Sequence, residues 1–521
     1  GPTSEATRRG PGGGAGPSRH RTGGLSVDRA VPASFWRGGT SRAVLFREED
    51  LAGYRPEQVE AIILAALGSP DPDGRQIDGL GGGISSLSKA AIVGPAPTGS
   101  GADVAFRFAQ VEVAEPRVDF TGNCGNISAA VAPFAVNEGL VPAGDPPRQP
   151  GVPSGQPGVA SGHFGVASGQ PGVASGHFGD SSGQPGDSSG QPGVASGHFG
   201  DSSGQPGVAS GQPGDSSRHP GEGRDPAGGA PADRAGVDVV VLSLNTGQRF
   251  GTRVPLRGDR YDQSGDFAID GVPGTGARLH LEYLDAGGSI GRGVLPTGQV
   301  REVVELPDLG AVPVSVVDVG NPAVFVAAAA LGVPAAAAAS PAALDADEVL
   351  GGRLERIRCE TAVRIGVADS LDDAGRHNRT VPKVALVGPP VPYRTTSGTE
   401  VPAAGVDLLV RLISMGRTHR TLAMTGAMAC AAAAVMDGSV VAELAPGSLG
   451  TAPPATASGA AVARRVRLGH PAGILALEVA AEGDAGTWRV RRLGVDRTAR
   501  EIMRGTVQVP QAYLDGEAWF T

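Results

Sequence analysis

Short apolar runs, many of them ended by glycine or proline, alternate with segments of helical spacing along most of the chain. Strands are predicted at residues 33–46, 90–93, 104–113, 237–244, 279–284, 312–318, 363–367 and 384–387. Helices are predicted at residues 56–67, 127–138, 323–331 and 424–436, the last of them rich enough in alanine to be buried on all sides. Pro56 opens the first helix and Gly68 follows it, as helix boundary signals require. The mixture predicts an α/β protein.

A seven-residue repeat interrupts this pattern between residues 148 and 224. Its units, such as GQPGVAS and GHFGDSS, hold glycine in fixed places, which excludes a coiled coil. Such a composition cannot bury enough apolar surface to offset its ordering entropy, so we expect residues 143–235 to be a disordered insertion in a folded domain. Residues 1–28 are expected to be a disordered leader. The histidines of the repeat are too loosely spaced to predict a metal site.

Composition excludes several classes of function. The net charge is −9 and aromatic residues make up 4% of the chain, so no basic, aromatic surface for nucleic acid is expected. The most apolar stretch, residues 323–344, is mostly alanine and is cut by two prolines, so no membrane span is expected. Three cysteines form no disulfide framework and the first residues lack an apolar secretory signal, which favours a reducing, cytoplasmic location.

The two halves of the chain share a weak internal similarity. GTSRAVLF at residues 39–46 and GNPAVFV at residues 320–326 both place a glycine turn before an apolar run. Thr121-Gly122 and Thr425-Gly426 both accompany a helix of small residues that ends near a glycine. These parallels predict a duplicated domain around a shared cleft.

The segment TGNCGN at residues 121–126 is the most informative for chemistry. Its glycines let backbone N–H groups approach a ligand, and the N-terminus of the helix that follows favours a carboxylate or a phosphate. The same positive potential stabilises a thiolate, so Cys124 is predicted to be reactive. Cys359 and Cys430 are expected to be structural thiols.

A second glycine-rich loop, GLGGGISSLSK, ends in Lys89. Its backbone N–H groups suit an anion, but it has neither the P-loop order nor a dinucleotide fingerprint. Only two of the 44 basic residues are lysines, Lys89 and Lys383. Lysine can lose its proton near neutral pH, whereas arginine cannot. A lysine that is kept in so arginine-rich a chain therefore indicates a role in proton transfer or in carboxylate binding.

Two further polar turns supply hydrogen-bond donors. FWRGGTSR at residues 35–42 offers hydroxyl and guanidinium groups to an oxyanion. MGRTHRT at residues 415–421 contains His419, which is either a base or a structural histidine.

Together these motifs resemble those of the PrpF-like isomerases, which include 2-methylaconitate isomerase, 4-oxalomesaconate tautomerase and methylitaconate isomerase. FWRGGTSR, QIDGLGGGISSLSK, NCGN, IDGVPGTGA, LPTG, DVGNP, VPK and a histidine before TGA occur in that family's order. The resemblance implies two similar diaminopimelate-epimerase-like α/β domains, at residues 29–310 and 311–521, with a central cleft. It also implies a cofactor-free proton shift within a small unsaturated di- or tricarboxylate.

The resemblance also implies roles for single residues. The family's cysteine and lysine fall on Cys124 and Lys89, the expected acid–base pair, without showing which is the acid. No metal ligands are expected, and the sequence leaves open whether the protein is a homodimer. The residues expected to bind substrate are Gly39, Thr40, Ser41, Ser85, Ser86, Gly125, Asn126, Asn321, His419, Thr425 and Gly426.

Three other functions compete with this one. A two-base amino-acid racemase or epimerase needs a second thiol facing Cys124, which the sequence does not clearly provide. A Cys–His hydrolase would pair Cys124 with His419 and pass through an acyl-enzyme. A carboxylate-binding accessory protein would bind the same ligands without exchanging protons.

Overall fold

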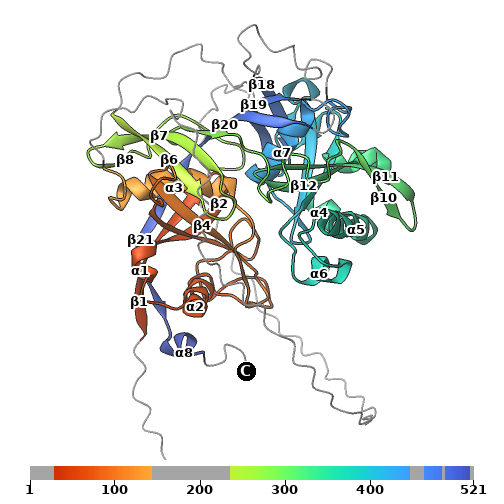
Figure 1. Ribbon diagram of the computed structural model, residues 1–521. Coiled ribbons are helices and arrows are strands. Elements are labelled where there is room, and N and C mark those ends of the chain that lie inside the picture. The colour runs from red at the N-terminus through yellow and green to blue at the C-terminus, as the bar shows by residue number, and fades with distance from the viewer. Residues whose placement is uncertain (1–27, 143–234, 446–462, 484–486, 517–521) are drawn as a thin grey trace, which may run out of the picture. The chain divides into compact units, whose positions relative to one another are not determined.

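The computed structural model describes residues 28–142, 235–445, 463–483 and 487–516 (Figure 1). In this part of the chain, 19 strands belong to one sheet, and β14 (Tyr393–Arg394) and β15 (Glu400–Val401) form a separate pair. The expected disordered leader and insertion lie outside the described residues, except for Asp28 and Ala235 at their edges.

The N-terminal half of the fold, defined here as β1 to β9, also contains the short helix α1 and the two longer helices α2 and α3. Its elements are β1 (Arg29–Gly38), β2 (Ser41–Arg47), α1 (Glu48–Leu51), α2 (Pro56–Leu67), β3 (Lys89–Pro95), β4 (Val104–Val111), β5 (Val118–Asp119), α3 (Gly125–Asn137), β6 (Gly236–Ser243), β7 (Arg249–Arg257), β8 (Arg260–Tyr261) and β9 (Leu279–Leu284).

The C-terminal half, defined here as β10 to β19, adds several short helices between its strands. Its further elements are β10 (Glu302–Leu306), β11 (Gly310–Val319), β12 (Asn321–Ala327), η1 (Ala328–Leu331), η2 (Pro334–Ala338), α4 (Pro341–Asp345), α5 (Glu348–Arg364), α6 (Leu371–Arg376), β13 (Lys383–Gly388), η3 (Ala403–Gly405), β16 (Leu408–Ser414), β17 (Arg417–Thr418), α7 (Met424–Ala434), β18 (Arg464–His470) and β19 (Gly473–Glu482).

The two halves repeat one pattern of strand pairing, which confirms the predicted duplication. In the N-terminal half β1–β2 is antiparallel, β2–β3 parallel, β3–β4 antiparallel, β4–β6 parallel and β6–β7 antiparallel. The C-terminal half repeats these orientations in β11–β12, β12–β13, β13–β16, β16–β18 and β18–β19. Gly39 and Gly320 turn the equivalent hairpins at φ +50° and +81°, a region that glycine enters without strain.

Each half surrounds one helix of small residues. Every residue of α7 is buried, and so is every residue of α3 except its last. The helix α3 contacts β1 to β4, β6 to β8 and β21, while α7 contacts β11, β12, β18 and β19 (Figure 1). A helix that is apolar on all sides has to be enclosed in this way, and alanine lets the strands approach it closely. The buried alanine-rich helix predicted at residues 424–436 is therefore confirmed.

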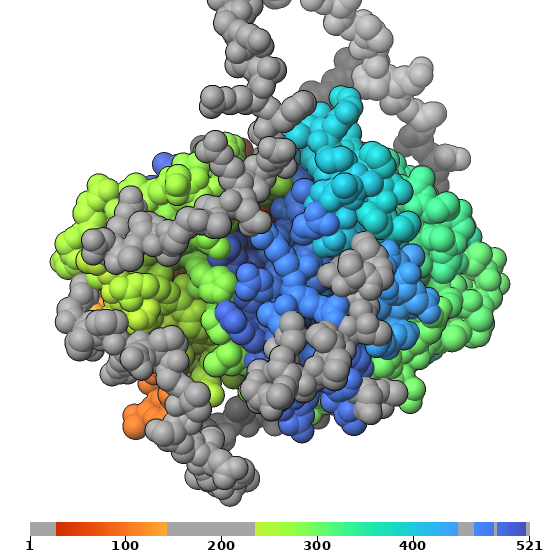
Figure 2. Space-filling model, turned by 90° about the horizontal axis from the view of Figure 1, so that it is seen from above, coloured from red at the N-terminus to blue at the C-terminus, as the bar shows by residue number. Residues whose placement is uncertain are grey.

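The end of the chain ties the halves together. The strand β20 (Arg489–Arg497) pairs with both β19 and β9, and β21 (Ala499–Val509) pairs with β1, before the short helix α8 (Gln511–Leu514). Figure 2 shows C-terminal residues in blue between the yellow-green segment that follows residue 235 and the green-to-cyan segments of the C-terminal half. The domain limits 29–310 and 311–521 stay a prediction. The structure shows in addition that β21, which lies in the second predicted domain, pairs with β1 of the first.

Two element predictions are wrong in type, and residues 33–46, predicted as one strand, form the two strands β1 and β2 of a hairpin that turns at Gly39. Residues 363–367, predicted as a strand, form the end of α5 and the turn after it. Asp347 caps this helix, and Leu350, Leu354 and Ile357 line its buried face. Ile365 lies buried just after the helix, whereas Val363 is exposed, so the short apolar run does not form one buried strand. Residues 323–331, predicted as a helix, form β12 and then the 3₁₀ turn η1, because their first half is apolar and lies between β11 and β13.

The helix starts also align differently from the expectation. Thr121-Gly122 precede α3, whose N-cap is Cys124, whereas Thr425-Gly426 lie inside α7, whose N-cap is Ala423. Thr425 is therefore the counterpart of Asn126, and Ala423 is the counterpart of Cys124.

Candidate active site

A small cavity lies where the two halves meet. Its volume is about 30 Å³, two to three times the ~10–15 Å³ that one water molecule requires, so a ligand with several carboxylates enters only if the surrounding groups move. The lining residues are Ser41, Ser85, Lys89, Phe108, Gln110, Gly122, Asn123, Cys124, Gly125, Asn126, Asn321, Thr380, Lys383, Ser414, His419, Ala423, Met424 and Thr425.

The duplication extends into this cavity. Lys89 is the first residue of β3 and Lys383 is the first residue of the equivalent β13, so both lysines of the chain lie at matching places in the two halves. Cys124 and Ala423 cap the equivalent helices α3 and α7. The lining therefore resembles two copies of one half-site, in only one of which the helix start carries a thiol.

Lys89 is buried among neutral groups. Its Nζ donates to Oε1 of Gln110 and lies 5.2 Å from the centroid of the Phe108 ring. The amide of Gln110 is oriented by its Nε2, which donates to the carbonyl oxygens of Ser85 at 3.1 Å and Ser88 at 2.9 Å. Burial lowers the pKa of Lys89, although the nearby Cys124 opposes the shift. A lysine in this setting can release a proton more readily than an exposed one.

Cys124 lies where α3 begins. Its backbone N–H donates to Oδ1 of Asn123 at 2.7 Å, and its carbonyl oxygen accepts from Ser128, which starts the helix on this residue. A Cβ on Gly125 would lie 2.4 Å from Cε and 3.1 Å from Cβ of Met424, which shows how closely the starts of α3 and α7 approach each other. The N-terminus of α3 is thereby directed into the cavity beside the thiol.

Lys383 is a second cation in the same cavity. Its Nζ donates to the carbonyl oxygen of Thr380 at 3.0 Å. Burial, helped by the charge of Lys89, lowers the pKa of Lys383 to about 8. Among the lining residues, all of which lie in the described part of the chain, there is no Asp or Glu to balance the two lysines.

His419 is neutral in this setting. Burial, followed by the charges of Lys89 and Lys383, lowers its pKa to about 3. Its Nδ1 accepts from the backbone N–H of Thr421 at 3.2 Å, so in the neutral ring the proton is assigned to Nε2. His419 therefore contributes an uncharged N–H donor to the cavity wall.

Two polar atoms at the cavity lack a partner within the described residues. They are Oγ of Ser41 and Oδ1 of Asn126, both buried. A buried polar group without a hydrogen bond costs about 1–3 kcal/mol. Both atoms are enclosed by protein, so they reach a bound molecule only when the surrounding groups move.

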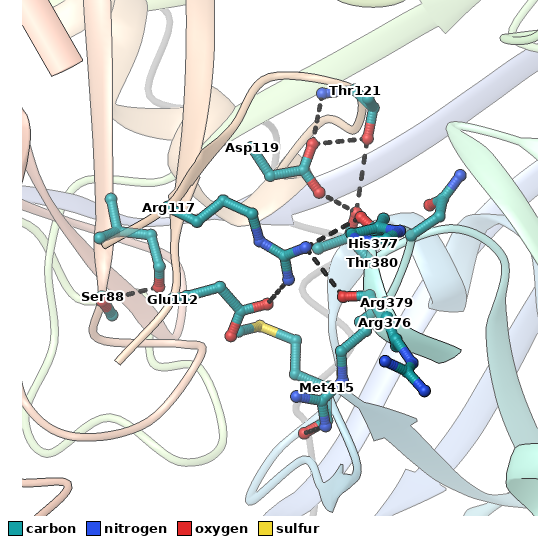
Figure 3. A network of polar contacts seen from close by, with 12 residues as sticks. Ser88, Glu112, Arg117, Asp119, Thr121, Arg376, His377, Arg379, Thr380 and Met415 are labelled. Atoms are coloured by element: carbon teal, nitrogen blue, oxygen red, sulfur yellow. Dashed lines mark hydrogen bonds and ion pairs between the residues drawn. The ribbon is translucent and has the colours of Figure 1, made fainter. Parts of the chain in front are cut away.

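Polar contacts bridge the halves next to the cavity (Figure 3). Arg117 pairs with Glu112 at 2.8 Å and donates to the carbonyl oxygens of Arg376 and His377, both at 3.0 Å. Asp119 accepts from both the backbone N–H and the hydroxyl of Thr121.

Asp119 also accepts from the hydroxyl of Thr380, which lines the cavity in the opposite half. These contacts hold the halves together around the small cavity.

The structure brings most of the predicted site residues together. Both predicted catalytic residues line the cavity, as do seven of the predicted binding residues, which are Ser41, Ser85, Gly125, Asn126, Asn321, His419 and Thr425.

Four predicted binding residues lie behind this lining. Gly39 forms the hairpin turn, and Thr40 accepts from Asn126 at 3.2 Å and from Thr421 at 3.0 Å. The carbonyl oxygen of Ser86 accepts from the backbone N–H of Arg42. A Cβ on Gly426 would lie 2.8 Å from Leu412, which shows how closely α7 packs on β16.

Sequence reasoning did not assign several lining residues. Lys383 had a signal, since it is one of two lysines and stands in the VPK motif. Gln110, Phe108 and Ser414 had none, because they lie in strands whose pairing brings them to the cavity. Thr380 belongs to a loop that no pattern distinguished.

The other two cysteines are buried and do not line the cavity, and their expected structural role stays a prediction. Burial raises the pKa of Cys359 to about 11, and Cys430 lies fully buried inside α7. No helix among the described residues is both long and apolar enough to cross a membrane. Within the same residues, no group of three or more His, Cys, Asp or Glu is arranged to hold a metal ion.

Comparisons with known proteins agree with this arrangement. A sequence model of the family described as PrpF protein matches residues 28–152 and 227–510. The 2-methyl-aconitate isomerase of Cupriavidus necator is 30% identical over 92% of this chain and 97% of its own length. The 3-methylitaconate isomerase of Eubacterium barkeri is 29% identical over 94% of this chain and 100% of its own length.

A third relative and one solved structure extend these findings. The 4-oxalomesaconate tautomerase of Pseudomonas putida is 29% identical over 92% of this chain and 95% of its own length. The crystal structure of a methylitaconate-delta-isomerase is 29% identical and superposes with a TM-score of 0.59 over 95% of this chain and 100% of that chain. This likeness confirms the expected α/β fold.

Proposed function

Because the chain belongs to the PrpF family, we propose that it is an isomerase that shifts a proton within a small unsaturated di- or tricarboxylate. Relatives that match nearly the whole chain are named as isomerases or tautomerases of 2-methyl-aconitate, 3-methylitaconate and 4-oxalomesaconate. The proposed chemistry needs only side chains of this protein.

One observation carries the proposal. Both lysines of the chain line one cavity together with Cys124 at a helix N-terminus, and no acidic side chain lines that cavity in the described structure. Two cations without counter-charges favour a ligand with several negative charges. The unpaired oxygens of Ser41 and Asn126 can bind its polar groups once the surrounding groups move to admit the ligand.

The proposed reaction moves one proton and one double bond. One member of the pair formed by Lys89 and Cys124 removes a proton from a carbon next to the double bond, and the electron pair of that C–H bond moves into a dienolate. The other member protonates the far end of the dienolate, so the double bond changes place and no atom is gained or lost. The substrate's charge is the same before and after the reaction.

The developing negative charge has donors around it. The start of α3 and His419, whose neutral ring carries its proton on Nε2, both line the cavity. Fixed donors that face a developing oxyanion stabilise the transition state without reorganising. A neutral histidine contributes such a hydrogen bond without competing for the proton.

The structure disfavours the racemase alternative. A two-thiol mechanism requires a cysteine at the counterpart of Cys124, but that place in α7 is occupied by Ala423. Cys430 lies about two turns further along the helix and is fully buried. The Cys–His hydrolase is also disfavoured, because Nδ1 of His419 already accepts from Thr421.

Proton NMR in deuterated water tests the proposal. Itaconate and aconitate are incubated with the protein, and the proton signals of the C–H groups next to the double bond are followed. We expect at least one acid to gain deuterium there and to form its double-bond isomer. If neither acid nor a methylated analogue of either exchanges a proton, the protein only binds carboxylates and the proposed function is wrong.

A further inference from the structure

We propose that Lys383 binds a second carboxylate of the substrate, so that the cavity selects acids with at least two carboxylates. This inference rests on the proposed function for the kind of molecule that enters the cavity. It adds the residue that sets the minimum number of carboxylates.

The position of Lys383 is fixed by the duplication. Strands β3 and β13 each pair in parallel with the second strand of their hairpin, β2 or β12, and each begins with its lysine. The next strand on the other side, β4 or β16, supplies Gln110 or Ser414 to the cavity wall. Two equivalent cations thus face one cavity from two halves of the molecule.

Lys383 has a donor capacity that the protein does not use up. An ammonium group donates three hydrogen bonds, and the structure gives Nζ of Lys383 one acceptor, the carbonyl oxygen of Thr380. It forms no ion pair with an acidic residue in the described parts of the chain. Asp119, which contributes to its electrostatic environment, is bound by Thr121 and Thr380.

The charged form of Lys383 is disfavoured by its surroundings. Burial, helped by the charge of the neighbouring Lys89, lowers its pKa. A carboxylate beside it reverses this effect by compensating the charge. A monocarboxylate can compensate only one of the two lysines, whereas a di- or tricarboxylate can compensate both.

Binding of saturated acids tests the inference separately from catalysis. Tricarballylate, glutarate and butyrate carry three, two and one carboxylates and have no double bond to shift. Their affinities are measured by calorimetry for the wild type and for Lys383→Met, which removes the charge, and Lys383→Gln, which keeps a donor for Thr380. Arg379→Met is the matched control, because it removes a nearby cation that does not line the cavity.

We expect wild-type protein to bind tricarballylate at least tenfold more tightly than butyrate. Both Lys383 variants are expected to lose at least tenfold in tricarballylate affinity, and Arg379→Met to stay within twofold of wild type. Lys383→Met is expected to fold, since it removes a disfavoured buried charge, and thermal unfolding checks this.

Tricarballylate affinity within twofold of wild type in either folded Lys383 variant would overturn the inference. If such a variant also lost turnover, Lys383 would belong to proton transfer instead. The inference stands, and the proposed function alone fails, if the affinities change as expected but no unsaturated acid exchanges deuterium.

Discussion

The side-chain amide of Asn321 forms hydrogen bonds with both the N–H group and the carbonyl oxygen of the Asn123 backbone. Its Oδ1 accepts from the N–H of Asn123 at 3.1 Å, and its Nδ2 donates to the carbonyl oxygen of Asn123 at 2.9 Å. Both residues are buried and 198 positions apart. The turn between β11 and β12 thus positions the segment just before Cys124.

Replacing Asn321 by alanine is expected to destabilise the protein. Two buried backbone groups of Asn123 lose their partner, which costs about 1–3 kcal/mol in free energy of unfolding. Urea denaturation measures the change. The same variant should also lower turnover, since the residue next to Cys124 is no longer held, and unchanged stability would show that Asn123 finds another partner.

Replacing Cys124 by serine is expected to lower turnover at least ~100-fold, within the range of general acid–base groups. The hydroxyl keeps the size of the thiol but gives up its proton far less readily, so the fold should remain. Cys359→Ser is the matched control, because this thiol lies in α5 and does not line the cavity. Turnover near that of wild type in Cys124→Ser would remove this thiol from the chemistry.

Because His470 is buried and has a lowered pKa, we expect the folded protein to become less stable in acid. Burial, followed by Arg497, Arg411 and His419, lowers the pKa of this histidine to about 3. The unfolded chain binds a proton here below about pH 6.5, and the folded chain does not until about pH 3. The stability that His470 contributes is therefore complete above pH 6.5 and is lost as the pH falls from 6.5 toward 3.

The variant His470→Asn isolates this contribution, because Asn can still accept from the N–H of Ala472. Urea denaturation at pH 7.5 and pH 5.0 gives the loss of stability in acid for both proteins. We expect the loss to be smaller in the variant by about 2 kcal/mol. Equal losses would mean that His470 is protonated in the folded protein at pH 5.

The sequence predicted the duplication and the core of the site because both leave local marks. Glycine turns, a helix of small residues and a cysteine between two glycines are visible in a few consecutive letters. Gln110 and Ser414, one in each half-site, reach the cavity only through strand pairing, so no local motif marks them.

The two wrong elements have the same origin. A short apolar run fits either a strand or one face of a helix, and only its neighbours decide. The helix capped by Asp347 continues through residues 363–364, although Val363 is exposed, while residues 323–327 pair with strands on both sides as part of β12.

Removing the repeat is expected to leave the enzyme active. The family match ends at residue 152 and resumes at residue 227, so the residues between them have no counterpart in the family. We expect a variant without residues 153–226 to keep turnover within about twofold and a similar melting temperature, since the segment's composition supports no core. A large loss of either property would assign the repeat a role in the fold or at the cavity.

The variant Lys89→Arg tests the central claim most directly, because arginine keeps the positive charge but cannot exchange a proton near neutral pH. Tricarballylate binding and deuterium incorporation into the active unsaturated acid are measured on the same preparation. If Lys89 moves the proton, binding stays within about tenfold of wild type while kcat falls at least ~100-fold. Retained kcat together with retained binding would contradict the account and reduce Lys89 to a carboxylate anchor.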